Sequence, residues 1–271
     1  MKSTLLLAFL FVFSTQMLNA QSYRNDASKK YEASPLSKRK IKEQVYKKNI
    51  VKFNLTGLIL KSAGFQYEHK IGRKTSLSLG LIYRPKATWF LSNYYDTTTA
   101  STGYSQESKF MMASSRLRSF IITPEFRYYL GRQAPKGLYL AAFARFKCNK
   151  TQFSYHYYDD VNLVQRSALG NLNETMIGGG VLFGYQLVTR KRLTIDFWFL
   201  GPWIGNQHVK LLSNVNTSSI SSLQQTFIAQ DMKVMLSKEH DIQWNTKGIL
   251  TTFNYVALSA RFAGINVAYS F

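Results

Sequence analysis

The feature that most constrains the fold is a period-two alternation of apolar and polar residues that returns along most of the chain. In IVKFNLTGLIL (50–60), Val51, Phe53 and Leu55 alternate with Lys52 and Asn54. Successive side chains of a β-strand point to opposite faces, so this pattern predicts strands with one apolar and one polar face. Similar stretches follow at 63–70, 75–84, 120–130, 138–147, 176–187, 193–200 and 255–271, which brings the total to about eight strands.

The carboxyl-terminal stretch GINVAYSF has the same pattern up to its last residue. Ile265, Val267, Tyr269 and Phe271 alternate with small residues. Ends that pack against nothing are usually polar, so this strand must be held by a neighbour. In a closed antiparallel barrel the last strand pairs with the first, which removes the free edge. We also expect a bulge near 263–264 that turns Arg261 inward.

The first residues have the layout of a secretory signal peptide. A basic start is followed by an apolar run from Leu5 to Phe13 and by Ala20 before Gln21. We therefore predict that residues 1–20 are removed on export; an uncleaved membrane anchor is the alternative. Gln21 is not the cysteine that a lipid anchor needs. No later apolar run is long enough for a spanning helix, so a membrane-embedded chain would cross as strands.

Export bears on the meaning of the strong positive charge. The chain has 35 Lys and Arg residues against 14 Asp and Glu, a formal net charge of +21. An exported protein does not meet cytoplasmic nucleic acid, so we predict no nucleic-acid partner. Cys148 is the single cysteine, which excludes an internal disulfide. We predict three segments: the signal peptide at 1–20, a basic periplasmic arm at 21–48 and the barrel at 49–271.

The lengths of the connections also alternate. Three expected turns are short (71–74, 131–136 and 189–192), and three expected loops are long and polar (85–115, 148–173 and 201–247). Short periplasmic turns and long extracellular loops are typical of outer-membrane barrels. The turn at Lys61–Ser62 would be a short one facing outward. Within the last loop, the spacing of Ile220, Leu223, Phe227 and Met235 predicts a short amphipathic helix.

Charged residues fall on two sets of positions. By strand parity, seven point into the barrel: Lys52, Glu68, Arg84, Glu125, Arg127, Arg145 and Asp196. Buried charges must be paired, so we expect an ion-pair network with the three carboxylates as acceptors. A proton or ion path is the alternative. The second set forms a basic periplasmic rim on the short turns: Lys70, Arg73, Lys74, Arg132, Lys136, Arg190, Lys191 and Arg192.

This rim and the basic arm are expected on the same side of the membrane. Their simplest role is contact with phospholipid phosphates. A more specific role is docking of residues 21–48 on an acidic periplasmic partner, or on a larger envelope complex that uses the barrel as an anchor.

Three stretches carry a family resemblance: VKFNLTGLILKSAGFQYEHKIGRKTSLSLGLIYR, then ITPEFRYYLG, then FLGPWIG followed by a polar loop and ARFAGINVAYSF. Together they resemble a family of small Gram-negative outer-membrane β-barrel proteins of unknown function, with the eight-stranded OmpA/OmpX-type architecture. The terminal strand also resembles the signal by which such barrels are handed to the barrel-assembly machinery. The resemblance implies that Tyr269 and Phe271 form this signal.

These observations predict a non-enzymatic outer-membrane component that binds no cofactor or metal. His69, His156, His208 and His240 lie far apart in the chain without the spacing of metal ligands. A lipid-modifying barrel enzyme is one alternative, with His69 and either Ser62 or Ser115 as the reactive pair. A narrow pore and a soluble periplasmic barrel are the others.

Overall fold

The computed structural model describes residues 47–88, 106–189, 192–236, 242–245 and 248–271. The predicted signal peptide and most of the basic arm lie outside these residues, as do Arg190 and Lys191. None of the helices in the described ranges has the length and apolarity needed to cross a membrane.

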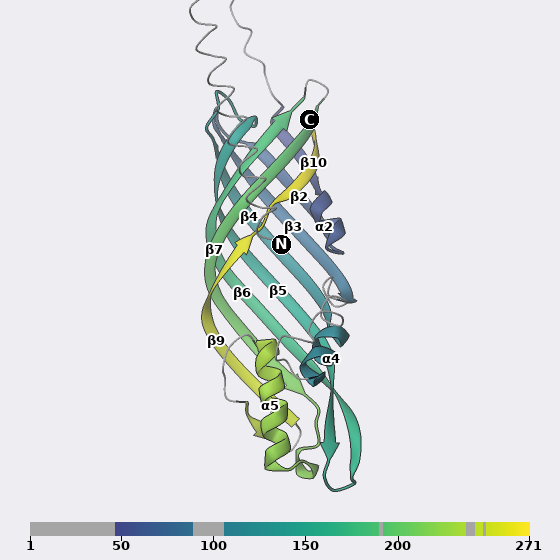
Figure 1. Ribbon diagram of the computed structural model, residues 1–271. Helices are drawn as coiled ribbons and strands as arrows, with labels where there is room; N and C mark the ends of the chain where they lie inside the picture. Colours follow the sequence, from purple (N-terminus) through teal and green to yellow (C-terminus); the bar gives the residue numbers. More distant parts are fainter. Residues whose placement is uncertain (1–46, 89–105, 190–191, 237–241, 246–247) are drawn as a thin grey trace, which may run out of the picture. The chain divides into compact units, whose positions relative to one another are not determined.

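The described residues form one antiparallel sheet (Figure 1). Its ten strands are β1 (Asn49–Asn54), β2 (Ala63–Lys70), β3 (Thr75–Thr88), β4 (Arg116–Tyr129), β5 (Gly137–Asp159), β6 (Val164–Val188), β7 (Leu193–Ser213), β8 (Trp244–Asn245), β9 (Gly248–Arg261) and β10 (Gly264–Ser270). The helices are α2 (Leu55–Ile59), α4 (Gln106–Ser114), η2 (Thr217–Ser219) and α5 (Ser222–Leu236).

The sheet closes into a ring because β10 pairs with β1 on one edge and with β7 on the other. β9 pairs with the remaining half of β7, so β9 and β10 together occupy one position in an eight-strand ring. The predicted eight-stranded antiparallel barrel is confirmed in this respect. The strand breaks at 262–263, close to the expected bulge, and Arg261 has an inward side chain that is 11% exposed.

One face of each strand is apolar and points outward. On β3, Leu77, Leu79 and Leu81 are 43–49% exposed, whereas Ser76 and Ser78 at the alternate positions are buried. The last strand follows the same rule: Ile265 and Tyr269 are exposed while Gly264, Asn266 and Ala268 are inside. This arrangement is the reverse of a soluble barrel, in which the apolar face would line the core.

The polarity of the two faces reverses toward the far end of the long strands. On β5, the outward residues become polar from Lys150 onward, while Phe153, Tyr155 and Tyr157 point inward and are buried. They join an apolar cluster that also contains Leu172 of β6. Here the barrel has an ordinary apolar core with a polar outside.

This reversal corrects the loop predictions. Residues 148–173 were expected to form a loop, but β5 and β6 continue through them to a hairpin at 160–163. Likewise β7 extends to Ser213, and β3 continues to Thr88. The outward residues of these segments are polar, so their sequence resembles that of a loop. The alternation of apolar and polar residues nevertheless continues, with the apolar residues now on the inward face.

The helix expected in the last long segment is present as α5. Leu223 and Phe227 of the predicted apolar spacing are 65% and 53% exposed. Ile228 and Met232 pack instead into the apolar cluster inside the barrel end. The helix therefore covers that end with a different set of residues.

The first strand is shorter than predicted, because Leu55–Ile59 form α2 instead of continuing β1. Asn54 caps this helix: its side-chain Oδ1 accepts a hydrogen bond from Gly57 N at 2.9 Å. Leu58 and Ile59 are 53% and 79% exposed on the outside. α2 contacts β2 and β10, and none of the described strands continues β1 at this position in the wall (Figure 1).

Candidate functional site

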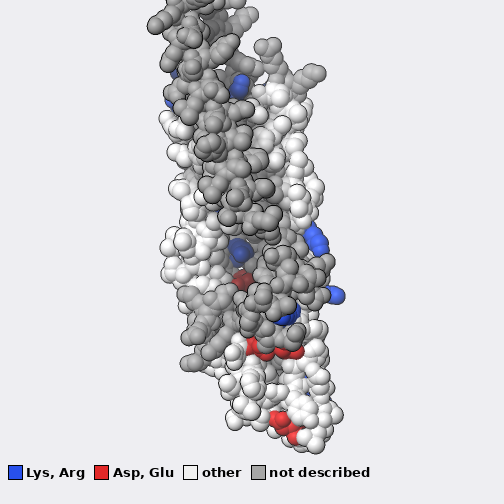
Figure 2. Space-filling model, in the orientation of Figure 1, with Lys and Arg blue, Asp and Glu red and all other residues white. Residues whose placement is uncertain are grey.

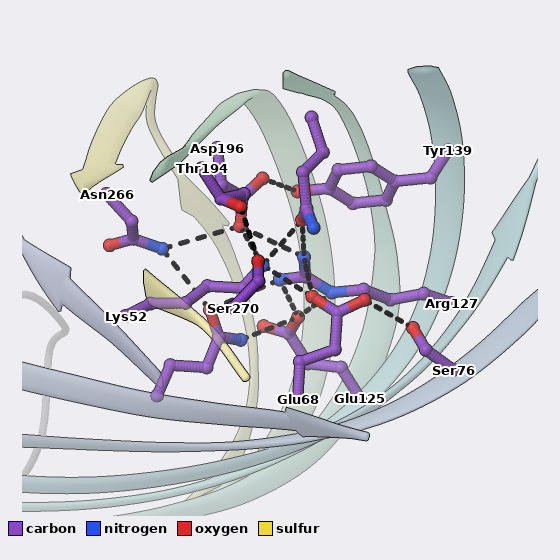
Figure 3. Close-up of polar contacts among 12 residues, drawn as sticks. Lys52, Glu68, Ser76, Glu125, Arg127, Tyr139, Thr194, Asp196, Asn266 and Ser270 are labelled. Atoms are coloured by element: carbon purple, nitrogen blue, oxygen red, sulfur yellow. Dashed lines mark hydrogen bonds and ion pairs between the residues drawn. The ribbon is translucent and has the colours of Figure 1, made fainter. Parts of the chain in front are cut away.

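A buried ion-pair network fills the interior at the end of the barrel that carries the short turns (Figure 3). Lys52 of β1 is fully buried, and its Nζ lies 2.6 Å from Glu68 Oε2 and 2.6 Å from Asp196 Oδ2. The same nitrogen donates to Gln186 Oε1 at 2.6 Å. One ammonium group therefore joins strands β1, β2, β6 and β7.

Arg127 of β4 is the second cation of the network. Its Nη2 lies 2.6 Å from Glu125 Oε2, and its Nη1 lies 3.0 Å from Asp196 Oδ2 and 3.4 Å from Glu68 Oε2. Its guanidinium carbon is 4.5 Å from the centre of the Tyr139 ring. Arginine suits this place because its planar group donates in several fixed directions at once.

Arg261 supplies the third positive charge, with Nη1 2.6 Å from Glu125 Oε1. Three carboxylates thus face three cations in the interior, and the cluster as a whole is neutral. A buried charge is costly to leave unpaired, so this balance allows the barrel to be filled with polar groups.

Neutral side chains complete the network. Tyr129 Oη donates to Glu68 Oε1 at 2.5 Å, and Tyr139 Oη donates to Asp196 Oδ1 at 2.8 Å. Ser76 donates to Glu68 at 2.6 Å. The pattern of charged residues in the sequence does not single out these side chains, nor those of Gln66, Gln186 and Asn266. Inward parity was the available signal for Gln66, Ser76, Tyr129 and Tyr139, which share a strand face with a predicted network charge. Gln186 of β6 and Asn266 of β10 lie on strands without such a charge.

Small residues on β10 make room for this packing. A Cβ atom added at Gly264 would lie 2.0 Å from the Trp198 ring. Trp198 Nε1 donates to Phe262 O at 2.8 Å, so the ring cannot easily move away. The small inward residues of GINVAYSF therefore reflect the bulk of the neighbours inside the barrel.

Two residues predicted for the network lie outside it. Arg84 Nη2 donates to the backbone oxygen of Thr88 at 3.2 Å. Arg145 lies over the Trp203 ring, with 5.6 Å between its guanidinium carbon and the ring centre. Both line a separate cavity of about 320 Å³, together with Lys147 and Arg261.

The basic turns lie at the same end of the barrel as the chain terminus. Lys70 ends β2, Arg73 and Lys74 belong to the β2–β3 connection, and Arg132 and Lys136 belong to the β4–β5 connection. Phe271 N donates to Asn49 O at 2.9 Å, which fixes the end of the chain beside the start of β1.

The two residues of the predicted assembly signal are exposed at this end. Tyr269 and Phe271 are 53% and 48% exposed. Arg192 Nη1 donates to Tyr269 Oη at 3.3 Å, which joins a rim cation to this pair.

The residues considered for lipid chemistry are not brought together. His69 Nδ1 lies 2.7 Å from Asn49 Oδ1. The hydroxyls of Ser62 and Ser115 donate to backbone oxygens of Gly57 and Met112 at 2.9 and 2.8 Å. Ser62 directly precedes β2 and His69 lies near its other end, about 23 Å away at 3.3 Å per residue. In the described part of the chain, no group of three or more candidate metal ligands occurs.

The solved structures that resemble this chain include CarO and CarO2, both of Acinetobacter baumannii. CarO is 15% identical, with 84% of this chain and 98% of that chain covered and a TM-score of 0.37. CarO2 is 12% identical, with 84% and 99% covered and a TM-score of 0.40. No curated protein matches the chain.

The family comparison covers most of the sequence. Residues 36–228 of the 271 match the family described as "Protein of unknown function (DUF3575)". The predicted resemblance to a family of unknown function agrees with this match, while the OmpA/OmpX type stays a prediction. The chain belongs to the DUF3575 family.

Proposed function

We propose that this protein is an outer-membrane β-barrel that acts, without enzymatic activity, as a structural, anchoring or interaction component of the cell envelope. The observation that carries the proposal is the outward apolar face of the strands around a charged interior. In water that arrangement would expose leucine and phenylalanine side chains while burying Lys52 and Arg127. In a bilayer the outward side chains contact hydrocarbon, and a closed barrel leaves few backbone groups unpaired.

The reversal of polarity supports one position for the bilayer. Figure 2 shows acidic side chains at the lower end, where Figure 1 places α5 and the β5–β6 hairpin, and a mostly uncharged described wall above. On β5 the outward apolar residues run from Leu138 to Cys148, which is about 33 Å at 3.3 Å per residue before tilt is considered. A tilted strand of that length matches the apolar band of a membrane barrel.

The interior favours an anchor over the narrow pore. Lys52, Glu68 and Asp196 are fully buried in mutual contacts. An eight-stranded barrel is only wide enough to be filled by its own side chains. The basic rim would then face the periplasm, where each cation near an anionic lipid surface contributes about 1 kcal/mol.

Membrane fractionation tests the proposal. We expect the full chain to sediment with outer membranes, to resist extraction by high salt and alkaline carbonate, and to dissolve in mild detergent. The folded barrel should also run faster than the boiled protein on a denaturing gel, because the closed sheet resists detergent unfolding. Release of the protein into the soluble fraction without detergent would contradict the proposal and favour the soluble barrel.

A second experiment tests the interaction role of residues 21–48. We expect a partner to co-purify with the barrel in mild detergent and to be lost when the nine Lys and Arg residues of this segment are changed to glutamine. The matched control changes Lys150 and Lys210, which lie on outward faces near the other end of the barrel, to glutamine. Equal recovery from the two variants would contradict docking through the arm, and recovery of no partner would favour a free-standing barrel.

A further inference from the structure

The barrel wall has an opening between β3 and β9. β9 pairs with β7 along one edge, and β8 covers only Gly248 and Ile249 of its other edge. β3 runs to Thr88 but loses its β2 partner after Tyr83. β1 does not fill the gap because it ends at Asn54 and continues as α2. Among the residues that the structure describes, no strand spans this part of the wall.

The cavity of about 320 Å³ lies at this opening and is lined by four cations: Arg84, Arg145, Lys147 and Arg261. Only Arg261 has an ion pair, with Glu125, within the described part of the chain. Glu174 attracts Lys147 electrostatically but forms no ion pair with it. The Glu174 carboxylate accepts hydrogen bonds from Asn149 at 3.2 Å and Gln207 at 2.9 Å.

Two of these cations have hydrogen-bonding capacity that is unused. Arg84 is only 7% exposed, and its buried Nε has no hydrogen-bond partner among the described residues; the same holds for the buried Nε of Arg145. Guanidinium groups do not lose their charge, so an anion is the complement that such a site lacks. Ionisable side chains at membrane depth generally mark a binding site or a pathway.

The outer border of the opening is apolar. Leu60 and Phe262 line the cavity there, and Phe262 is 76% exposed on the outer side. Ile82 lines the cavity from the inward face of β3. Leu58 and Ile59 of α2 extend the apolar surface outward from the opening. A ligand that satisfied both regions would carry an anionic group at one end and a hydrocarbon chain at the other.

We propose that this opening binds an anionic amphiphile, with its phosphate or carboxylate head among Arg84, Arg145 and Lys147 and its acyl chain against Leu60, Ile82 and Phe262. The inference rests on the proposed function in one respect, namely that the outer wall lies in hydrocarbon. The cavity volume is at the lower end of the range for ligand pockets, so it holds the head and the first part of the chain. Arginine forks suit either head group because both present paired oxygens.

Equilibrium binding to the delipidated full-length protein in a non-ionic detergent tests this inference. The probes are labelled palmitate, for a carboxylate head, and labelled phosphatidylglycerol, for a phosphate head. Phosphatidylcholine and inorganic phosphate serve as the zwitterionic and tail-free comparisons. We expect at least one anionic lipid to bind more tightly than both comparisons, and the preferred probe identifies the head group.

The variant R84Q/R145Q removes two cations from the cavity and should weaken binding of the preferred probe at least about tenfold. The matched control is R118Q/K150Q, which also removes two positive charges. Arg118 of β4 and Lys150 of β5 pair directly and both point outward. It should bind within about twofold of the unmodified protein, because exposed charges contribute little. Faster migration of unboiled protein verifies that both variants fold.

Three results would overturn the inference: binding of neither anionic lipid above phosphatidylcholine, equal binding of inorganic phosphate, or unchanged binding by R84Q/R145Q. The membrane assignment is tested separately by fractionation. A protein that sediments with the outer membrane but retains neither lipid would keep the proposed function and lose this site.

Discussion

Replacing Arg127 with leucine is expected to destabilise the barrel by about 3–5 kcal/mol, the usual cost of removing one partner from a buried ion pair. Arg127 contacts Glu68, Glu125 and Asp196, so its loss leaves three buried carboxylates with only Lys52 and Arg261 to balance them. The measurement is urea unfolding of protein refolded into phospholipid vesicles, followed by tryptophan fluorescence.

Arg118→Leu is the matched control on the same strand. Arg118 points outward and contacts the Tyr83 ring at 5.6 Å, so we expect a change within about 0.5 kcal/mol. A second variant, R127L/D196N, removes one carboxylate together with the cation and should recover part of the lost stability. Equal stability of Arg127→Leu and Arg118→Leu would show that the network contributes nothing to folding.

Period-two alternation predicted much of the fold because it is a local property. Leu77, Leu79 and Leu81 reveal a strand without knowledge of its neighbours, and their parity assigns the intervening residues to the opposite face. The terminal strand added the information that the sheet closes, since Ile265 and Val267 need a pairing partner. The eight positions of the ring follow from these two observations.

The pairing of particular charges is not available from that pattern. Lys52 and Asp196 are separated by 144 residues, and their contact depends on the register of every strand between them. The same limit explains Arg84 and Arg145, which have inward parity but lie at a different height in the barrel. The parity of a residue in its strand predicts whether its side chain points inward or outward. It does not predict the position of that side chain along the barrel axis.

Two local departures were hidden by the alternation itself. Leu55 and Ile59 fit period two, yet Asn54 caps a helical turn there. At the other end, Phe153, Tyr155 and Tyr157 continue period two on the inward face, where water outside and an apolar core inside exchange the roles of the two faces. An exchange of the apolar and polar faces along a single strand therefore resembles a loop in the sequence.

We expect the second large effect on stability from Leu79→Arg. Its size depends on which solvent surrounds the barrel. Leu79 lies on the outward face of β3 and is 47% exposed. Arginine facing the middle of a bilayer costs about 2–4 kcal/mol in a membrane barrel. On the surface of a soluble barrel the same change should lie within about 0.5 kcal/mol, because an exposed arginine is hydrated there. Urea unfolding in phospholipid vesicles measures the difference.

Leu169→Arg provides the comparison within the same protein. Leu169 of β6 is also outward and 50% exposed, but it lies in the segment where the outward face has become polar. Its replacement should therefore change stability by less than about 0.5 kcal/mol. The two substitutions are chemically identical and start from similar exposure. A difference between their effects on the free energy of unfolding therefore reports the solvent that surrounds each position. Equal costs at the two positions would contradict an apolar band at Leu79 and, with it, the membrane assignment.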